Sequence, residues 1–267
     1  MPFDPSYWLI YFGVGIFVGF FAGLLGIGGG SVTVPILSLI FIAKGYAPAH
    51  VIHMALGTSL AVIIIGSFAS AREHHQHQAV NWNAVKTMTP GILLGTFSGA
   101  VFAYFVSTRF LKFFFVGFIF FLALQLILDI KPKRHRDLPG TGGLLLFGFV
   151  MGWLSSLAGI GGAVLSITFL TWCNVKLHEA IGTSAAIGFP IAIAGTSGFI
   201  ATGLFDHSLP EWSLGYVYLP AWVGISVTSY FIAPLGAKLT HRLPVKVLKK
   251  VFILFLVALA IKMAVSV

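Results

Sequence analysis

Two glycine clusters set inside apolar stretches are the features of this sequence best suited to binding a ligand. One is GIGGG at residues 26–30, and the other is GIGGA at residues 159–163. Glycine in a helix costs about 1 kcal/mol relative to alanine, so each cluster predicts a helix break with exposed amide N–H groups. Such amides, with the positive end of the helix that follows, bind anions without a formal positive charge. The two matching clusters therefore predict a paired, broken-helix anion site.

Glycine clusters also serve helix packing and nucleotide binding in proteins. Close helix packing through small residues explains Gly15 and Gly19 well. It explains the G-I-G-G strings less well, because consecutive glycines face every side of a helix. A dinucleotide-binding fingerprint is excluded, because no strand precedes the first cluster and no acidic ribose partner follows at the needed place.

A polar string, H-x-A-x-G-T-S, occurs once in each half of the chain, at residues 53–59 and 178–184. Its hydroxyl groups can donate to an oxyanion, and its glycine allows close approach. The alternative is a hydroxyl bonded back to its own helical turn, which is common in membrane helices. The predicted substrate-binding residues are Gly28, Gly29, Gly30, Ser31, Thr58, Ser59, Gly161, Gly162, Thr183 and Ser184.

Each of these strings begins with a histidine, His53 or His178. Histidine changes charge near neutral pH, so either residue could act as a pH-sensitive gate or carry a coupling proton. The alternative is an interfacial or helix-capping histidine. No acidic residue lies well inside an apolar segment, since even Asp129 and Glu179 lie near segment ends, which argues against a cation pathway. No nucleophile–base arrangement occurs, so we expect no enzyme activity, cofactor or metal site.

The composition predicts an integral membrane protein. Hydrophobic residues make up 58% of the 267 residues and charged residues only 9%, and the mean hydropathy is +0.98. Soluble domains contain about 25% charged residues. The apolar runs, such as residues 113–128, are continuous and do not alternate with polar residues, which excludes a β-barrel. We therefore expect a multi-pass, all-α protein of the cell (inner or plasma) membrane.

The net charge of +9 does not indicate nucleic-acid binding, because Lys and Arg cluster in short loops between apolar segments. The most basic loop, residues 131–136, could contact anionic lipid. The single cysteine, Cys173, excludes an intramolecular disulfide and a cysteine-built metal site.

About ten helical segments are expected, most of them near the length of about 20 residues that a membrane crossing needs. The second and seventh are shorter, and each follows a glycine cluster. The ten segments are 7–25, 31–43, 50–71, 84–106, 109–130, 141–158, 163–174, 178–203, 213–235 and 245–266.

The two halves of the chain match, which predicts an internal duplication. Both the glycine clusters and the polar strings align between the halves. The predicted units are an N-terminal repeat of five segments at 1–130, a basic cytoplasmic linker at 131–140 and a C-terminal repeat of five segments at 141–267.

An odd number of crossings in each repeat predicts that the two repeats have inverted topology. With the linker placed in the cytoplasm, most of the 16 Lys and Arg residues lie inside, as the positive-inside rule requires. Only Lys44, Arg109, Lys112 and Lys262 lie outside. The alternative has re-entrant short segments, four crossings in each half and parallel repeats.

These motifs together resemble the sulfite exporter TauE/SafE family. The resemblance rests on G-x-x-G-I-G-G-G at residues 23–30, its copy at 159–163 and both H-x-A-x-G-T-S strings, and it covers nearly the whole chain. It implies a secondary transporter of small sulfur-containing anions such as sulfite, thiosulfate, sulfoacetate or other organosulfonates. Ala163 stands where the first half has Gly30, so the two half-sites need not be equivalent.

The expected function is therefore transport of a small sulfur oxyanion by alternating access, with the site at the repeat interface. An anion channel that uses the same donors is one alternative. A membrane assembly subunit, in which the glycine clusters serve only for packing, is the other.

Overall fold

Helices make up almost all of the part of the chain that the computed structural model describes, which is residues 5–25, 29–128, 137–239 and 245–266. The ten helices of these ranges are α1 (Pro5–Leu25), α2 (Gly30–Ala43), α3 (Pro48–Gln76), α4 (Trp82–Phe105), α5 (Thr108–Leu128), α6 (Thr141–Ala158), α7 (Ala163–Trp172), α8 (Leu177–Gly203), α9 (Leu219–Leu239) and α10 (Val245–Ser266). The all-α prediction is confirmed. The described residues also form a small antiparallel hairpin between α8 and α9, made of β1 (Ser213–Leu214) and β2 (Val217–Tyr218).

The helices following the glycine clusters are short, as the sequence predicts. Helix α2 has 14 residues and α7 has 10. Each begins directly after a glycine in the left-handed region, Gly29 or Gly162, both with a φ of 68°. Because an L-side chain is strained at that φ, glycine is the residue that lets the chain turn into each helix start.

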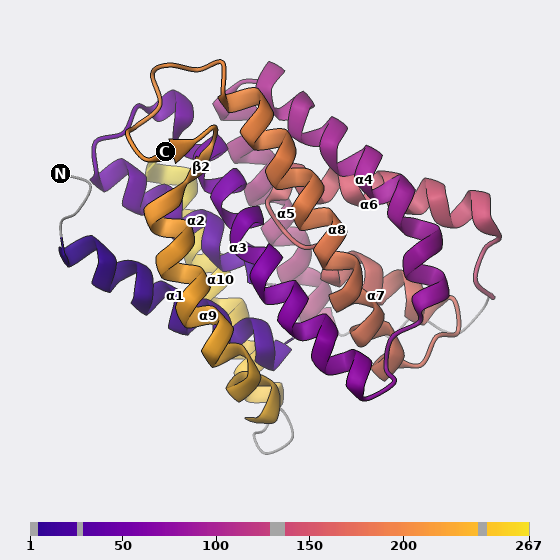
Figure 1. Ribbon diagram of the computed structural model, residues 1–267. Helices are drawn as coiled ribbons and strands as arrows, with labels where there is room; N and C mark the ends of the chain where they lie inside the picture. Colours follow the sequence, from indigo (N-terminus) through magenta and orange to yellow (C-terminus); the bar gives the residue numbers. More distant parts are fainter. Residues whose placement is uncertain (1–4, 26–28, 129–136, 240–244, 267) are drawn as a thin grey trace.

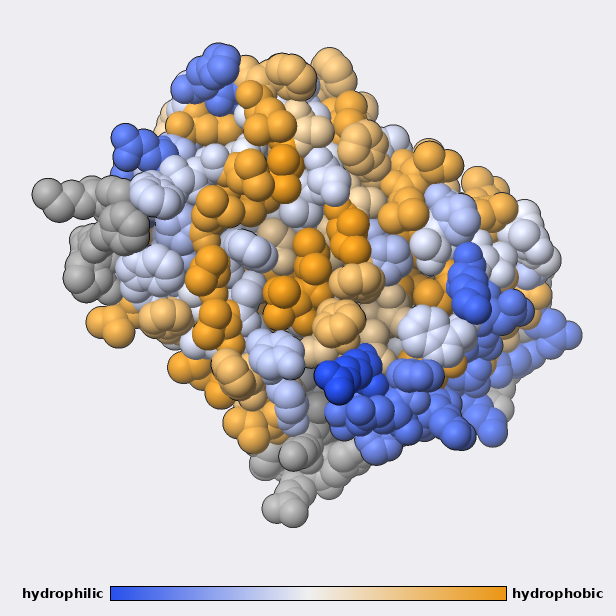
Figure 2. Space-filling view, viewed as in Figure 1, coloured by the Kyte–Doolittle hydropathy of each residue, from blue (hydrophilic) through white to orange (hydrophobic). Residues whose placement is uncertain are grey.

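The length and composition of the helices fit a lipid environment. Five described helices are long and apolar enough to cross a membrane: α3, α4, the part of α5 at Thr108–Gln125, α6 and α8. Large apolar side chains such as Phe105 (76% exposed) point outward. Figure 2 shows apolar residues over much of the visible face and hydrophilic residues gathered mainly at one end.

Several of the main helix contacts match when the two halves of the chain are exchanged. Helices α3 and α8 pack together in the middle, with α1 against α9 on one side and α4 against α6 on the other (Figure 1). Exchanging the halves, so that α1 becomes α6 and α4 becomes α9, turns the α1–α9 pair into the α6–α4 pair. The same exchange relates α4–α8 to α9–α3 and α2–α3 to α7–α8.

Helix directions follow from which glycines face which neighbours. Along α1, Gly15 lies against Ile225 and Gly19 against Ser229, so α1 and α9 run in the same direction. In contrast, Gly188 of α8 lies beside Ser67, while Phe199 of the same helix lies beside Gly57. Helices α3 and α8 therefore run in opposite directions, an arrangement compatible with inverted repeats.

Small residues bring the helices close together. Gly15 and Gly19 pack directly on the backbone of α9, as expected for close helix packing. At the α4–α6 crossing, a Cβ added to Gly91 or Gly95 would overlap a carbonyl oxygen of α6. In a membrane, helices associate through such close backbone approach, because lipid removes the hydrophobic driving force between them.

Candidate functional site

The two glycine breaks lie in contact with each other at the interface of the two halves. A Cβ added to Gly30 would overlap the carbonyl oxygen of Gly159 and would lie 3.1 Å from Cα of Ile160. The Ser59 hydroxyl donates a hydrogen bond of 2.9 Å to the same Gly159 carbonyl. The structure therefore brings residues of both predicted half-sites together, although Gly28 lies outside the described residues.

Neither helix start at the breaks is capped by a side chain. The residues before α2 and α7, Gly29 and Gly162, make no side-chain cap hydrogen bond. The hydroxyls of Thr33 and Ser166 bond back to the carbonyls of these glycines, each at 3.0 Å, and so do not cap the first-turn amides. Of these amides, the Val32 N–H donates to the Gly29 carbonyl at 3.1 Å. Uncapped N–H groups at a helix start need a partner, and an anion is a suitable one.

Two buried hydroxyl groups at the breaks have no hydrogen-bond partner among the described residues. They belong to Ser31, in the first turn of α2, and to Ser155, near the end of α6, and both residues are 0% exposed. The Ser155 hydroxyl lies 3.0 Å from the position that a Cβ on Gly162 would occupy. Because a buried polar group without a partner is costly, these two hydroxyls are the donors that a ligand here could use.

Ser155 is absent from the residues predicted from sequence. That prediction depends on recurrence in both halves, and the position that aligns with Ser155 in the first half is Ala22. The available signal is the pair of adjacent serines, Ser155 and Ser156, which two apolar residues separate from the second cluster.

The serines of the two polar strings hold the backbone at the breaks. Ser59 donates to Gly159, as described, while Ser184 donates to the Ala163 carbonyl at 3.2 Å and its hydroxyl oxygen lies 2.7 Å from that of Ser166. These hydroxyls fix the carbonyl groups of each break and do not bond to its amides.

The threonines of the strings bind backbone from the opposite half. The Thr58 hydroxyl accepts from the N–H of Tyr218, in the connection between α8 and α9, and the Thr183 hydroxyl accepts from the N–H of Asn81, in the connection between α3 and α4, both at 2.9 Å. The preceding glycines, Gly57 and Gly182, allow this approach, because a Cβ on either would press on a carbonyl oxygen of the docked connection. We call residues 204–218 docked on α3 the α3 clamp, and residues 77–81 docked on α8 the α8 clamp.

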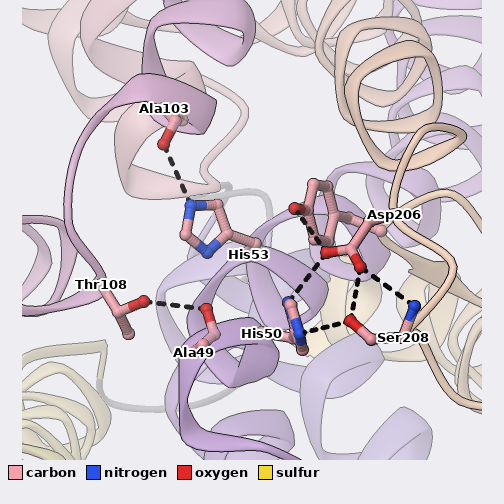
Figure 3. A network of polar contacts seen from close by, with 8 residues as sticks. Ala49, His50, His53, Ala103, Thr108, Asp206 and Ser208 are labelled. Atoms are coloured by element: carbon pink, nitrogen blue, oxygen red, sulfur yellow. Dashed lines mark hydrogen bonds and ion pairs between the residues drawn. The ribbon is translucent and has the colours of Figure 1, made fainter.

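Since α3 and α8 run in opposite directions, the two clamps lie at opposite ends of the helix pair. The side chain of Asn81 completes the α8 clamp. Its Nδ2 donates to Glu179 at 3.0 Å, and its Oδ1 accepts from the N–H of Ala84 at 3.0 Å. The α3 clamp carries an ion pair instead, with His50 Nδ1 3.1 Å from Asp206 Oδ2 (Figure 3). The hydroxyl of Ser208 lies 3.0 Å from Nε2 of the same histidine.

The two predicted coupling histidines lie in different surroundings. His53 is 6% exposed, and its Nε2 lies 3.0 Å from the carbonyl oxygen of Ala103 in α4 (Figure 3). His178 is exposed at the start of α8. Their equivalence in sequence therefore does not extend to burial.

Electrostatics in the α3 clamp centre on Asp206. Burial raises the pKa of this carboxyl group, but the hydrogen bonds from Ser208 and the neighbouring His50 outweigh burial, so the pKa is lowered overall. Burial, followed by the Asp206 charge, raises the pKa of Tyr216 to about 12, so its hydroxyl stays protonated and donates to the carboxylate at 3.3 Å.

Replacing Asp206 by Asn is expected to change how stability depends on pH. A carboxyl group whose pKa is lowered on folding stabilises the protein above its unfolded value of about 3.9, and this contribution disappears as the pH falls through the folded pKa. Asp206→Asn should therefore lower the melting temperature at neutral pH and reduce the loss of stability on acidification. Thermal unfolding of the detergent-solubilised protein across this range measures both effects. Asp137→Asn, at an exposed position before α6, is the control, and identical pH profiles for both variants would contradict the prediction.

Comparison with known proteins gives a consistent result. A family profile described as "Sulfite exporter TauE/SafE" matches residues 11–263. A "Probable membrane transporter protein" of Haemophilus influenzae is 39% identical over 94% of this chain and 95% of that protein. A protein of the same description from Methanocaldococcus jannaschii is 28% identical over 88% of this chain and 87% of its own length. No solved structure matches this chain.

Proposed function

The chain belongs to the sulfite exporter TauE/SafE family of membrane proteins, and from this premise we propose that it carries a small sulfur-containing anion across the cytoplasmic membrane. It is a multi-pass membrane transporter and not an enzyme. The proposed substrates are sulfite, thiosulfate, sulfoacetate and other organosulfonates. The proposed site lies where the two glycine breaks meet.

One observation carries this proposal: the two breaks, which meet at Gly30 and Gly159, each have an uncapped helix start and a partnerless buried hydroxyl. Helix starts at Gly30 and Ala163 present amide donors, and Ser31 and Ser155 add hydroxyl donors. A tetrahedral or pyramidal oxyanion has several oxygens that can accept from such donors at once. The site would bind through neutral groups, which favours moderate affinity and release over tight capture.

The two clamps favour alternating access as the mechanism. They close opposite ends of the central α3–α8 pair, and each joins one half of the chain to the other. In the proposed cycle one clamp opens while the other stays closed, so that the site faces one side of the membrane at a time. A channel would need both ends open together, and a packing subunit would need no partnerless donors at the breaks.

The repeat boundaries belong to this proposal. We take residues 1–130 and 141–267 as the two inverted repeats and 131–140 as the linker between them. Contact of the basic loop 131–136 with anionic lipid is also a proposal, because that loop lies outside the described residues.

The proposal is tested by adding sulfite, thiosulfate, sulfoacetate and sulfate separately to the purified protein and recording the melting temperature. A ligand that binds only the folded protein raises this temperature in proportion to the logarithm of its concentration. Uptake of the stabilising anion into proteoliposomes then separates carrier from channel, because a carrier shows saturation and counterflow. The absence of any shift and of any uptake would contradict the substrate class.

Ser155→Ala is expected to weaken anion binding by roughly tenfold to a hundredfold, the loss of about 1.5 to 3 kcal/mol that a hydrogen bond to a charged group supplies. Ser156→Ala is the matched control, because its hydroxyl is already bonded to the Trp153 carbonyl at 2.8 Å. Concentration dependence of uptake in proteoliposomes measures both variants. Equal effects of the two substitutions would show that Ser155 does not contact the anion.

A further inference from the structure

The imidazole of His53 is buried beneath the α3 clamp, and one of its nitrogens is left without a partner. Its Nε2 faces the carbonyl oxygen of Ala103 at 3.0 Å, and a carbonyl can only accept a hydrogen bond. In the neutral ring the hydrogen therefore resides on Nε2, and Nδ1 is a bare acceptor. Among the described residues Nδ1 has no hydrogen-bond partner. His53 thus presents a basic atom that the closed clamp keeps from water.

The ring is enclosed by elements of both halves. The ring of Tyr216, in the turn of the hairpin, lies over it with centroids 5.1 Å apart and planes at 32°. The titratable groups on the elements around it are His50 of α3, Asp206, His207 and Tyr216 of the 204–218 connection, Tyr104 of α4, and Arg109 and Lys112 of α5.

Asp206 does not supply the missing partner. Its Oδ2 already contacts His50 and the Tyr216 hydroxyl, and its Oδ1 accepts from the N–H and the hydroxyl of Ser208 (Figure 3). An imidazolium at His53 would therefore be attracted by this carboxylate without being hydrogen-bonded to it. The Ala49 carbonyl, one turn before His53, is the other nearby acceptor, but it already accepts from the Thr108 hydroxyl at 2.8 Å (Figure 3). Water is therefore the partner that Nδ1 lacks.

We propose that Nδ1 of His53 is a proton-binding site whose occupancy releases the α3 clamp. A proton added to this nitrogen needs an acceptor, and lifting residues 204–218 from α3 lets water supply one. Because binding and conformational change are linked reciprocally, a proton that binds better to the open clamp shifts the clamp toward opening. The proposal depends on the proposed function in one respect: the open clamp is taken to be a route to the anion site.

The neighbouring His50–Asp206 pair responds to acid in the opposite direction. Protonation of His50 strengthens its attraction to the Asp206 carboxylate and holds the connection on α3. The two effects can be separated with His53→Gln, which removes the proposed proton site and leaves His50 and Asp206 in place.

The proton site belongs to one end of the molecule. The α8 clamp is held by the Asn81 contacts with Thr183 and Glu179, and the histidine that aligns with His53, His178, is exposed. Under the predicted topology the α3 clamp faces outward, so external acid would open the outer clamp and leave the inner one unaffected.

A pair of buried reporter cysteines tests this proposal in the full-length protein. In a Cys173→Ala background, Val217→Cys places a thiol within the α3 clamp at a position 3% exposed, and Ala79→Cys places one within the α8 clamp at a position 7% exposed. Labelling of each thiol by a water-soluble maleimide is timed on the detergent-solubilised protein, where both clamps face the reagent, at about pH 5 and about pH 8, the range in which histidine changes charge. Each measurement is repeated with His53→Gln.

The ratio of the acid rate to the neutral rate is compared between variants, so that the intrinsic pH dependence of the thiol cancels. For Val217→Cys we expect His53→Gln to lower this ratio at least about fivefold, the size of a modest allosteric coupling. For Ala79→Cys we expect no change. Equal ratios with and without His53 in the Val217→Cys protein would overturn the proposal.

A second measurement applies if the His53→Gln protein does not fold. The imidazole nitrogen resonances of His53 are followed by NMR from about pH 8 to about pH 5 in the otherwise unaltered chain. Protonation of Nδ1, accompanied by faster labelling of Val217→Cys, supports the proposal, and a neutral ring throughout overturns it. Neither measurement uses a sulfur anion. A result against the proton site would therefore leave the proposed anion transport untouched, and a result against anion transport would leave the proton site untouched.

Discussion

Replacing Gly30 by Ala is expected to lower the rate of anion transport by about a hundredfold, the loss typical of a displacement of about 1 Å at a site. The added methyl group would overlap the Gly159 carbonyl oxygen and would lie 3.0 Å from the Ile63 side chain. Because both obstacles belong to packed elements, the two breaks must move apart. Their amide donors would then no longer converge on one ligand.

Gly30→Ala is also expected to lower the stability of the protein, which is the opposite of the usual effect of this substitution in a helix. At the start of an isolated helix, alanine in place of glycine would stabilise by up to about 1 kcal/mol. Gly66→Ala, in α3, is the matched control, because a Cβ there meets nothing within 4 Å. We expect it to leave transport unchanged, with uptake in proteoliposomes and thermal unfolding measured side by side. A Gly30→Ala protein that is more stable and fully active would show that the two breaks do not meet.

Replacing Gly182 by Ala is expected to be the most destabilising of these substitutions, at about 3 kcal/mol, the upper part of the usual cost of overpacking. The new methyl group would overlap the carbonyl oxygen of Ala79 and would lie 3.1 Å from Cβ of His74. Since this would push the 77–81 connection away from α8, the Asn81 hydrogen bond to Thr183 would be lost as well. A loss of this size lowers the melting temperature by about 6 °C or more.

Gly188→Ala in the same helix is the control for that variant. Its Cβ would lie 3.4 Å from Cβ of Ser67 and 3.5 Å from the Gly161 carbonyl oxygen, which is ordinary contact. We expect a melting temperature equal to or above that of the parent protein. Equal melting temperatures of Gly182→Ala and Gly188→Ala would show that the 77–81 connection does not pack tightly against Gly182.

Much of the architecture could be predicted from the sequence, because lipid imposes strong constraints on a chain. A helix that crosses a membrane must make all its backbone hydrogen bonds within itself, so continuous apolar runs predict helices. The glycine clusters and polar loops between these runs predict where the helices end. The predicted segment 31–43 corresponds to α2 at Gly30–Ala43, and 245–266 corresponds to α10 at Val245–Ser266. The start of the predicted helical segment 213–235 is wrong, because residues 213–218 form the hairpin β1–β2 and α9 begins only at Leu219.

The candidate site could be predicted only in part by the same reasoning. Recurrence of the glycine clusters identifies the breaks that meet in the structure. Recurrence also selects Thr58 and Thr183, whose hydroxyls accept backbone N–H groups of the opposite half. It passes over Ser155, which has no counterpart in the first half. A repeated motif marks a repeated contact, and that contact need not be with a ligand.

The sequence by itself determined the class of protein, the number and approximate limits of the helices, and the position of both breaks, because these depend on local composition. Only the tertiary structure decided that the breaks touch, that each threonine holds a connection from the other half, and that His53 is buried while His178 is exposed. The physical reason is that these features depend on which helices pack together and in which direction. That choice is made by contacts such as those of Gly30 with Gly159 and of Gly182 with Ala79, which join residues more than a hundred positions apart.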